Sequence, residues 1–168
     1  MFPNEYYTSQ TIIYVYTSIL QARVLRQSFT GACPTTCSNL SSPVEGVLKV
    51  HVLRAHSLPD TDGAFQGRSD PFAIVSAFRF FGSSSVSKST AVIQGTHDPV
   101  FDETLNFGCD KWRSISIGVL DSDCGRDEVL VPFESFPICS SGRCSVQHIS
   151  GSSWLNFDIE VIPVNNGC

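Results

Sequence analysis

The chain has 168 residues and a formal net charge of −5, and only 16 % of its residues are charged. Its length suits one domain of about 100–150 residues together with a short additional segment. No Lys or Arg cluster is present, so the composition excludes the basic face that nucleic-acid binding requires. With 42 % apolar residues, twelve Phe, twelve Gly and nine Pro, the chain is expected to form a β-rich core with many turns.

The first 44 residues differ from the rest, because they are rich in Ser and contain no strong strand pattern. The apolar run TIIYVYTSIL (11–20) has the length of the hydrophobic part of a signal peptide, but no Lys or Arg precedes Arg23. The run is also too short to span a bilayer. A degenerate signal and a plain amphipathic segment both remain open. We expect an N-terminal extension over 1–44 and one domain with a Cys-containing C-terminal tail over 45–168.

From Gly46 onward, short apolar runs alternate with turn signals. In GVLKVHVLRA the residues Leu48, Val50 and Val52 fall on one face of an extended chain. Strands are expected at 46–55, 71–80, 85–94, 100–107, 114–121, 128–133, 143–149 and 154–162. The sixth run contains a Pro, which suits an edge strand. Eight such runs and no convincing helix predict an all-β, eight-stranded antiparallel β-sandwich with an irregular N-terminal extension.

Antiparallel strands place successive loops at alternate ends of a sandwich. One end should receive the loops 55–70, 95–99, 121–127 and 150–153, and the other the loops 81–84, 108–113 and 134–142. The first end collects most of the loop acids, namely Asp60, Asp62, Asp70, Asp98, Asp121, Asp123 and Asp127. The second end collects the cysteines Cys33, Cys37, Cys109, Cys139, Cys144 and Cys168. Cys124 alone is expected to lie among the acids.

Seven cysteines without a C-x-x-C pair predict disulfides and an oxidising compartment rather than a zinc site. Asn39 begins an Asn-Leu-Ser sequence, which is an acceptor for glycosylation. The acids around Cys124 disfavour the thiolate that a nucleophile needs, and no motif of a known hydrolase is present. We therefore expect no enzyme. Cys124 is expected to be an odd exposed thiol or a bond to another chain.

The stretch VLDSDCGRDE (119–128) crowds four carboxylates directly after an apolar run. Asp121 and Asp123 are two positions apart, so an extended chain directs both to the same side. Asp70 comes immediately before the second expected strand, at the same end of the sandwich. Calcium binds 6–8 oxygen ligands of this kind, so the pattern predicts a Ca²⁺ site, with an ordinary solvated turn as the alternative.

Four pieces of sequence together resemble a C2 domain between Gly46 and Pro163. They are LPDTDGAFQGRSDPF, FRFFG, HDPVFDETLNFG and VLDSDCGRDE, in this order. Among C2 domains, the surplus cysteines and the acidic third loop look most like the C-terminal C2 domain of perforin. The resemblance implies calcium-dependent docking onto a phospholipid membrane surface.

The resemblance also implies a set of calcium ligands. These are Asp62, Asp70, Asp121 and Asp123, with Asp127 or Glu128 as the last acid. Asp62 and Asp70 are eight positions apart, which is wider than the family pattern, so Asp60 competes with Asp62 for this role. The third loop is shorter than the family pattern, and Val129 stands where the last acid is usually found.

Phe65, with Ala64 beside it, is the expected membrane-inserting tip, and Arg126 is expected to meet a lipid phosphate. We expect a secreted module that is peripheral on membranes and lacks a pore-forming domain. Its partners would be the phospholipid surface, a larger pore-forming protein of which it is a part, or a protein bound through Cys124. Two rivals remain: a calcium-independent extracellular protein-interaction sandwich with vestigial acidic loops, and an acidic matrix or mineral-associated protein.

Overall fold

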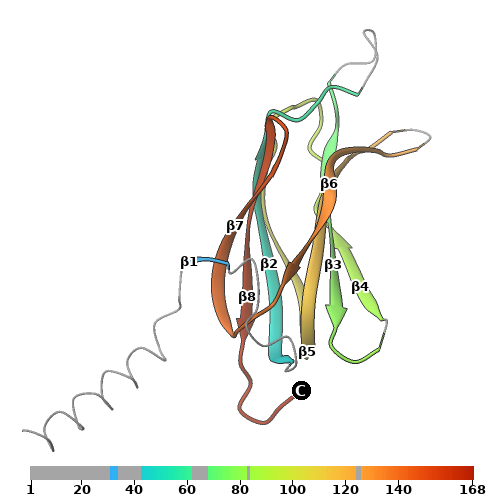
Figure 1. The fold of residues 1–168 in the computed structure, drawn as a ribbon. Helices are drawn as coiled ribbons and strands as arrows, with labels where there is room; N and C mark the ends of the chain where they lie inside the picture. The colour runs from blue at the N-terminus through green and yellow to red at the C-terminus, as the bar shows by residue number, and fades with distance from the viewer. Residues whose placement is uncertain (1–30, 34–42, 62–67, 83, 124–125) are drawn as a thin grey trace, which may run out of the picture.

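The computed structural model describes residues 31–33, 43–61, 68–82, 84–123 and 126–168. These residues form eight β-strands and no helix, so they contain no helical segment that could cross a membrane (Figure 1). The strands are β1 (Gly31–Ala32), β2 (Val44–His56), β3 (Pro71–Arg79), β4 (Ser85–Ser89), β5 (Val100–Asp121), β6 (Glu128–Pro137), β7 (Gly142–Ser150) and β8 (Ser153–Ile162). The all-β antiparallel sandwich predicted from the sequence is confirmed.

The strand β5 belongs to both layers of the sandwich, because the chain reverses direction within it. Trp112 lies beside Val44 at the start of β2 and beside Arg79 at the end of β3. The bend precedes Trp112, where Gly108 has a φ of 83° and its amide donates to the Asn106 side chain at 2.9 Å. Glycine adopts such a positive φ without a steric penalty. The expected strands 100–107 and 114–121 are therefore one element.

The two layers follow from the pairing of the two halves of β5. Its first half pairs with β2, which is followed outward by β8 and β7. Its second half pairs with β3 on one side and with β6 on the other, and β4 lies outside β3. The two-residue β1 pairs with β7 in parallel. Apart from residues 31–33, 43 and 44, the expected extension over 1–44 lies outside the described residues.

The core lies between the layers, and β2, β3 and β8 contribute alternate residues to it. Leu48, Val50 and Val52 are fully buried, as the alternation in the sequence predicts. Trp112 is 1 % exposed, and its indole N–H donates to the carbonyl of Gly46 at 2.9 Å. Each large apolar side chain buried in this way contributes about 1.5–3 kcal/mol.

Backbone hydrogen bonds join the loops at one end of the sandwich, which we call the acidic end: the described parts of 57–70, 90–99 and 122–127. The amide of Leu58 donates to the backbone carbonyl of His97 at 3.0 Å, and the amide of Thr96 donates to the backbone carbonyl of Ser69 at 3.0 Å. These two bonds connect the loop before β3 with the loop before β5. The alternation of loops between the two ends predicts this arrangement.

The opposite end, which we call the cysteine end, comprises the described parts of 80–84 together with 108–113, 138–141 and the C-terminus. The Cys109–Cys168 disulfide lies at this end, with a Cα–Cα distance of 5.4 Å. The Cys33–Cys144 disulfide, with a Cα–Cα distance of 4.8 Å, was expected here too but lies farther along the strands, because Cys144 pairs with Ile159 in the middle of β8. Cys139 is disulfide-bonded as well. The disulfides expected from the sequence are thus present, whereas Cys37 and Cys124 lie outside the described residues.

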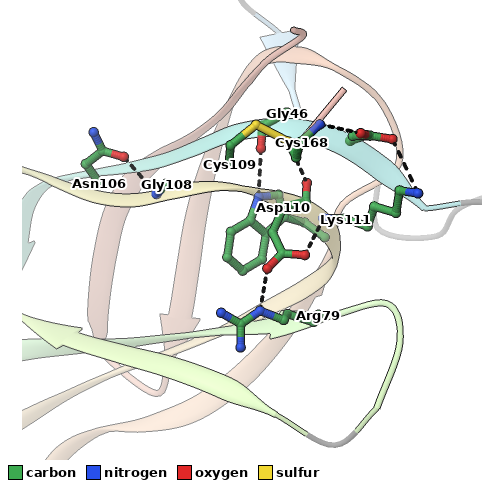
Figure 2. The surroundings of a disulfide bond; sticks show 10 residues. Gly46, Arg79, Asn106, Gly108, Cys109, Asp110, Lys111 and Cys168 are labelled. Carbon is green, nitrogen blue, oxygen red and sulfur yellow. Dashed lines mark hydrogen bonds and ion pairs between the residues drawn. A yellow bond between two sulfur atoms is a disulfide. The ribbon is translucent and has the colours of Figure 1, made fainter. Parts of the chain in front are cut away.

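The Cys109–Cys168 disulfide attaches the C-terminal tail to β5, and a polar contact supports it (Figure 2). The amide of Cys168 donates to Oε1 of Glu45 at 2.6 Å. The other carboxylate oxygen of Glu45 lies 3.7 Å from Nζ of Lys111. The tail is therefore held to both β2 and β5.

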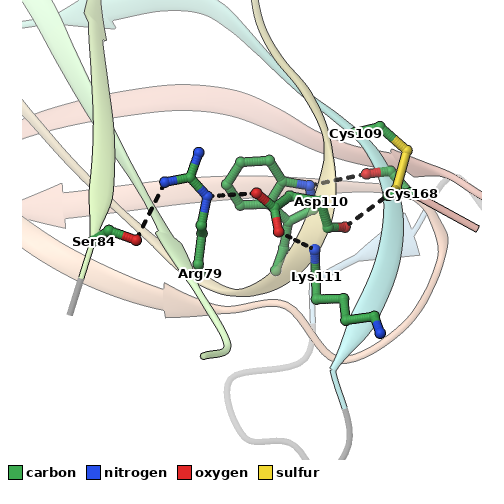
Figure 3. Close-up of polar contacts among 8 residues, drawn as sticks. Arg79, Ser84, Cys109, Asp110, Lys111 and Cys168 are labelled. Atoms are coloured by element: carbon green, nitrogen blue, oxygen red, sulfur yellow. Dashed lines mark hydrogen bonds and ion pairs between the residues drawn. A yellow bond between two sulfur atoms is a disulfide. The ribbon is translucent and has the colours of Figure 1, made fainter. Parts of the chain in front are cut away.

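Asp110 is the second acid at this end, and its charge is also compensated (Figure 3). The Lys111 amide and the Arg79 guanidinium both donate to the Asp110 carboxylate. The amide hydrogen bond is the largest cause that lowers the pKa of Asp110, and Arg79 lowers it further. Arg79 also donates to the Ser84 hydroxyl at 3.2 Å.

Candidate metal centre at the acidic end

Asp121 is the last residue of β5 and is 1 % exposed. Its backbone pairs with Pro71 of β3 and Glu128 of β6. Oδ2 accepts a hydrogen bond from the Thr61 hydroxyl at 2.6 Å, and Oδ1 accepts one from the Asp70 amide at 2.6 Å. A buried carboxylate is tolerated only with such partners.

The same contacts decide the charge of Asp121. Burial raises its pKa, but hydrogen bonds from Thr61, Ser69 and the amides of Asp70 and Ser122 lower it by more. The net pKa therefore lies below the ordinary value for an aspartate. Asp121 is an anion at neutral pH, fixed at the junction of three strands.

Asp70 connects the other loops to this carboxylate. It directly precedes β3, its Oδ1 accepts a hydrogen bond from the Gly95 amide at 2.6 Å, and its carbonyl accepts one from the Ser122 amide at 3.1 Å. A single aspartate thus touches the loop before β5 and the loop after it. The geometry holds Asp70 and Asp121 as neighbours.

The surroundings of Asp123 at this end raise the pKa of its carboxyl group. Loss of hydration is the largest cause that raises its pKa, followed by the negative charges of Asp121, Glu128, Asp127 and Asp70. The structure therefore brings five carboxylates into one electrostatic neighbourhood. Among the described residues, none of the five forms an ion pair with a Lys, Arg or His.

The other predicted site residues are either exposed or outside the described residues. Asp62, Ala64 and Phe65 lie outside the described residues, as does the predicted glycosylation site Asn39. Asp60 is exposed, with Oδ2 3.8 Å from Nε2 of His97. Arg126 is also exposed.

Asp98 has partners of its own. Its Oδ1 accepts the Ser57 amide at 2.9 Å and pairs with the ring of His56. The Ser57 hydrogen bond is the largest cause that lowers the pKa of Asp98. Asp98 therefore fixes the loop after β2 against the loop before β5.

The donor set at the acidic end fits a hard cation, because every candidate ligand offers carboxylate oxygen. Within the described ranges, however, no three His, Cys, Asp or Glu side chains lie close enough to hold a metal ion together. Thr61, the last described residue before Asp62, donates a hydrogen bond to Asp121. The residues Thr61, Ser69 and Gly95 were missed from the sequence. A carboxylate at the end of a buried strand needs hydrogen-bond donors, but the sequence does not show which residues supply them.

The fold and the acidic loops define a β-sandwich whose loop end gathers carboxylates, and comparison with known proteins identifies the class. The family model described as C2 domain matches residues 46–146, more than half of the chain. The chain therefore belongs to the C2 domain family, whose members commonly bind membranes or lipids. A search of curated proteins found no match.

Solved structures show the same fold at low sequence identity. Human GIVD cytosolic phospholipase A2 in complex with methyl gamma-linolenyl fluorophosphonate and terbium chloride is 16 % identical with a TM-score of 0.60, and the match covers 76 % of this chain and 18 % of that one. The first of the C2 domains of plant Extended Synaptotagmin 1 is 19 % identical with a TM-score of 0.59, covering 74 % and 98 %. A calcium-bound pair of C2 domains from Extended-Synaptotagmin 2 is 18 % identical with a TM-score of 0.53, covering 71 % and 46 %.

The chain thus spans less than a fifth of the phospholipase and nearly the whole of an isolated C2 domain. At these identities the likeness shows the fold alone.

Proposed function

We propose that this C2 domain is a secreted, non-enzymatic module that binds calcium at its acidic end and then docks onto phospholipid membranes, in the manner of a perforin-like targeting domain. The observation that carries the proposal is the position of the acids: the Asp70 amide donates to buried Asp121 at 2.6 Å, and three further acids follow Asp121 within seven positions. Among the described residues none of these carboxylates has a basic partner. Loss of hydration and the neighbouring charges raise the pKa of Asp123, in agreement with this arrangement. Negative charges held together in this way destabilise the protein until a cation joins them.

The ligands would be Asp62, Asp70, Asp121 and Asp123, with Asp127 or Glu128 as the last acid and Asp60 as a competitor for Asp62. Calcium, when bound, supplies the positive charge that cancels their repulsion and attracts lipid phosphate. Asp121 is the fixed point of the set, because hydrogen bonds from Thr61 and Asp70 hold both of its oxygens. An extracellular module of this kind binds calcium with a dissociation constant on the order of 10⁻⁴–10⁻³ M.

The apolar part of membrane docking would come from the loop between β2 and β3. Phe65 and Ala64 are the proposed tip, and Arg126 is the proposed contact to a lipid phosphate. Val129 is 53 % exposed directly after Glu128, so an apolar side chain already borders the acids.

Co-sedimentation with phosphatidylserine-containing liposomes tests the proposal. The wild-type chain should sediment with liposomes in millimolar calcium and remain in solution in EDTA. The double variant Asp121→Asn/Asp123→Asn should stay in solution in both conditions. Asp110→Asn removes one carboxylate charge at the cysteine end and should bind like the wild type. Binding that persists in EDTA would refute the calcium mechanism.

A calcium-independent protein-interaction sandwich is the second candidate. It is favoured by the observation that the described acids alone do not form a metal-holding group. Isothermal calorimetry separates the two candidates: calcium-dependent heat together with thermal stabilisation supports the first. The absence of both at millimolar calcium supports the second.

A further inference from the structure

A polar hollow lies on the outer face of the layer formed by β7, β8, β2 and the first half of β5. Its cavity volume is ≈ 60 Å³. Its lining residues are Lys49, His51, Thr104, Arg143, Asp158 and Glu160. None of them belongs to the acidic end, so the calcium proposal leaves the hollow without a role.

Asp158 is the unusual residue of this hollow. It is only 6 % exposed, although its neighbours Phe157 and Ile159 are the residues of β8 that face the core. Its Oδ2 accepts two hydrogen bonds from Arg143, whereas its buried Oδ1 has no partner among the described residues. Leaving a buried acceptor unpaired destabilises the protein. A donor that enters the hollow would relieve this destabilisation.

The charges around Asp158 alternate from strand to strand. Glu160 of β8 lies opposite Arg143 of β7 on one side and opposite Lys49 of β2 on the other. Two cationic and two acidic side chains therefore balance, before His51 is counted. A polyanion or a bare metal ion gains little from such a field, whereas a ligand that carries both signs is complementary to it.

The spacing of the groups narrows the ligand further. Neighbouring strands are about 4.7–4.9 Å apart, so donors on β2 and acceptors on β8 are separated by one strand interval. An ammonium group and a phosphate that are joined through two carbons can address both strands. In an α-amino acid a single carbon separates the ammonium group from the carboxylate, so its two charges lie closer together and match the two strands less well.

We propose that this hollow binds a small zwitterion with the chemistry of phosphoethanolamine. Its ammonium group donates to Oδ1 of Asp158 and to Glu160, and its phosphate accepts from Lys49 and Thr104. Arg143 is a positioning residue, because its hydrogen bonds hold Asp158 in place.

The hollow is separated from the acidic end along the strands. Asp158 lies beside His51, five residues before the end of β2, which corresponds to about 17 Å of strand. A membrane that contacts the loop tips therefore leaves the hollow clear of the surface. The same headgroup chemistry can come from a free compound or from a lipid, and the experiment must distinguish the two.

Titration of the ¹⁵N-labelled chain with free O-phosphoethanolamine in EDTA tests the site without calcium. We expect saturable amide shifts at 49–51, 104, 143 and 158–160. Glu160→Gln and Lys49→Met should each weaken binding about tenfold or more, equivalent to about 1.4 kcal/mol. Lys88→Met removes an exposed lysine from β4 and should change nothing. A second arm uses phosphatidylethanolamine vesicles in EDTA: co-sedimentation identifies a lipid source, and binding of the free compound alone identifies a soluble one.

Three results would overturn the proposal: no saturable shift, equal binding of inorganic phosphate, or equal affinity in the Glu160→Gln and Lys49→Met variants. Because calcium is absent throughout, these results leave the proposed calcium site untouched. A failure of calcium-dependent liposome binding likewise leaves this site untouched.

Discussion

The two ends of the sandwich are built from the same strands, but they treat negative charge in opposite ways. At the cysteine end, Asp110 pairs with Arg79, Glu45 pairs with Lys111, and the Cys109–Cys168 disulfide holds the C-terminal tail. At the acidic end, five carboxylates share one electrostatic neighbourhood, and loss of hydration together with the neighbouring negative charges raises the pKa of Asp123. The first arrangement stabilises the fold, and the second stores repulsion that a cation can relieve. We therefore expect substitutions at the two ends to separate stability from calcium binding.

The largest loss of stability should follow Trp112→Ala near the cysteine end. Trp112 is 1 % exposed and donates to the Gly46 carbonyl, and truncating such a residue costs about 3–5 kcal/mol. Urea denaturation measures this change. Calcium binding by the remaining folded protein should keep its midpoint, and a shifted midpoint would mean that the two ends are coupled.

Removing the Cys109–Cys168 disulfide should have the next largest effect. The bond closes a loop of 59 positions, and loss of a disulfide of this kind costs about 2–4 kcal/mol. The double variant Cys109→Ser/Cys168→Ser avoids a leftover thiol. Its melting temperature should fall while calcium-dependent liposome binding persists below that temperature. Loss of liposome binding in folded protein would contradict the division between the ends.

Thr61→Val removes the hydroxyl that donates to buried Asp121. A hydrogen bond to a charged group contributes about 1.5–3 kcal/mol, so the variant should lose roughly this much at neutral pH. The pKa of Asp121 is lowered in the folded chain, so its stabilising contribution is present above the ordinary pKa and disappears as the pH falls through the folded pKa. Denaturation measured from pH 7 to acid should show the deficit shrinking. A deficit independent of pH would assign the effect to packing instead.

Asp123→Asn should produce the smallest change, and in the opposite direction. The pKa of Asp123 is raised in the folded chain, so its ionisation destabilises the fold as the pH rises. In EDTA at pH 7 the variant should melt at a higher temperature than the wild type, and the difference should vanish in acid. In millimolar calcium the wild type should instead melt at the higher temperature, because only the wild type has the complete set of ligands that the ion stabilises. An unchanged order would argue against Asp123 as a ligand.

Much of the fold follows from sequence because it depends on alternation and on loop parity. The buried residues Leu48, Val50 and Val52 and the loop end that receives Asp70 and Asp121 were predicted in this way. The assignment of loops to alternate ends of the sandwich does not change when a strand boundary is wrong by a few residues. The predicted loop ends are therefore correct although the expected strands 100–107 and 114–121 form one strand, β5.

The details that sequence could not supply depend on three-dimensional contacts. Nothing local marks the Thr61 hydroxyl as a partner of Asp121, which is 60 positions away. Disulfide pairing is ambiguous for the same reason, since many connectivities fit one set of cysteines. The bend of β5 at Gly108 looked like a turn between two strands, because a positive φ serves both purposes.

The central claim is that calcium binds where the acids gather and nowhere at the cysteine end. A calcium titration of the ¹⁵N-labelled chain followed by NMR tests it most directly. The account predicts saturable shifts at millimolar calcium for amides of 57–70, 95–98 and 121–128, with Cys109, Asp110 and Cys168 unmoved. Shifts that are absent, unsaturable or spread over both ends would contradict it.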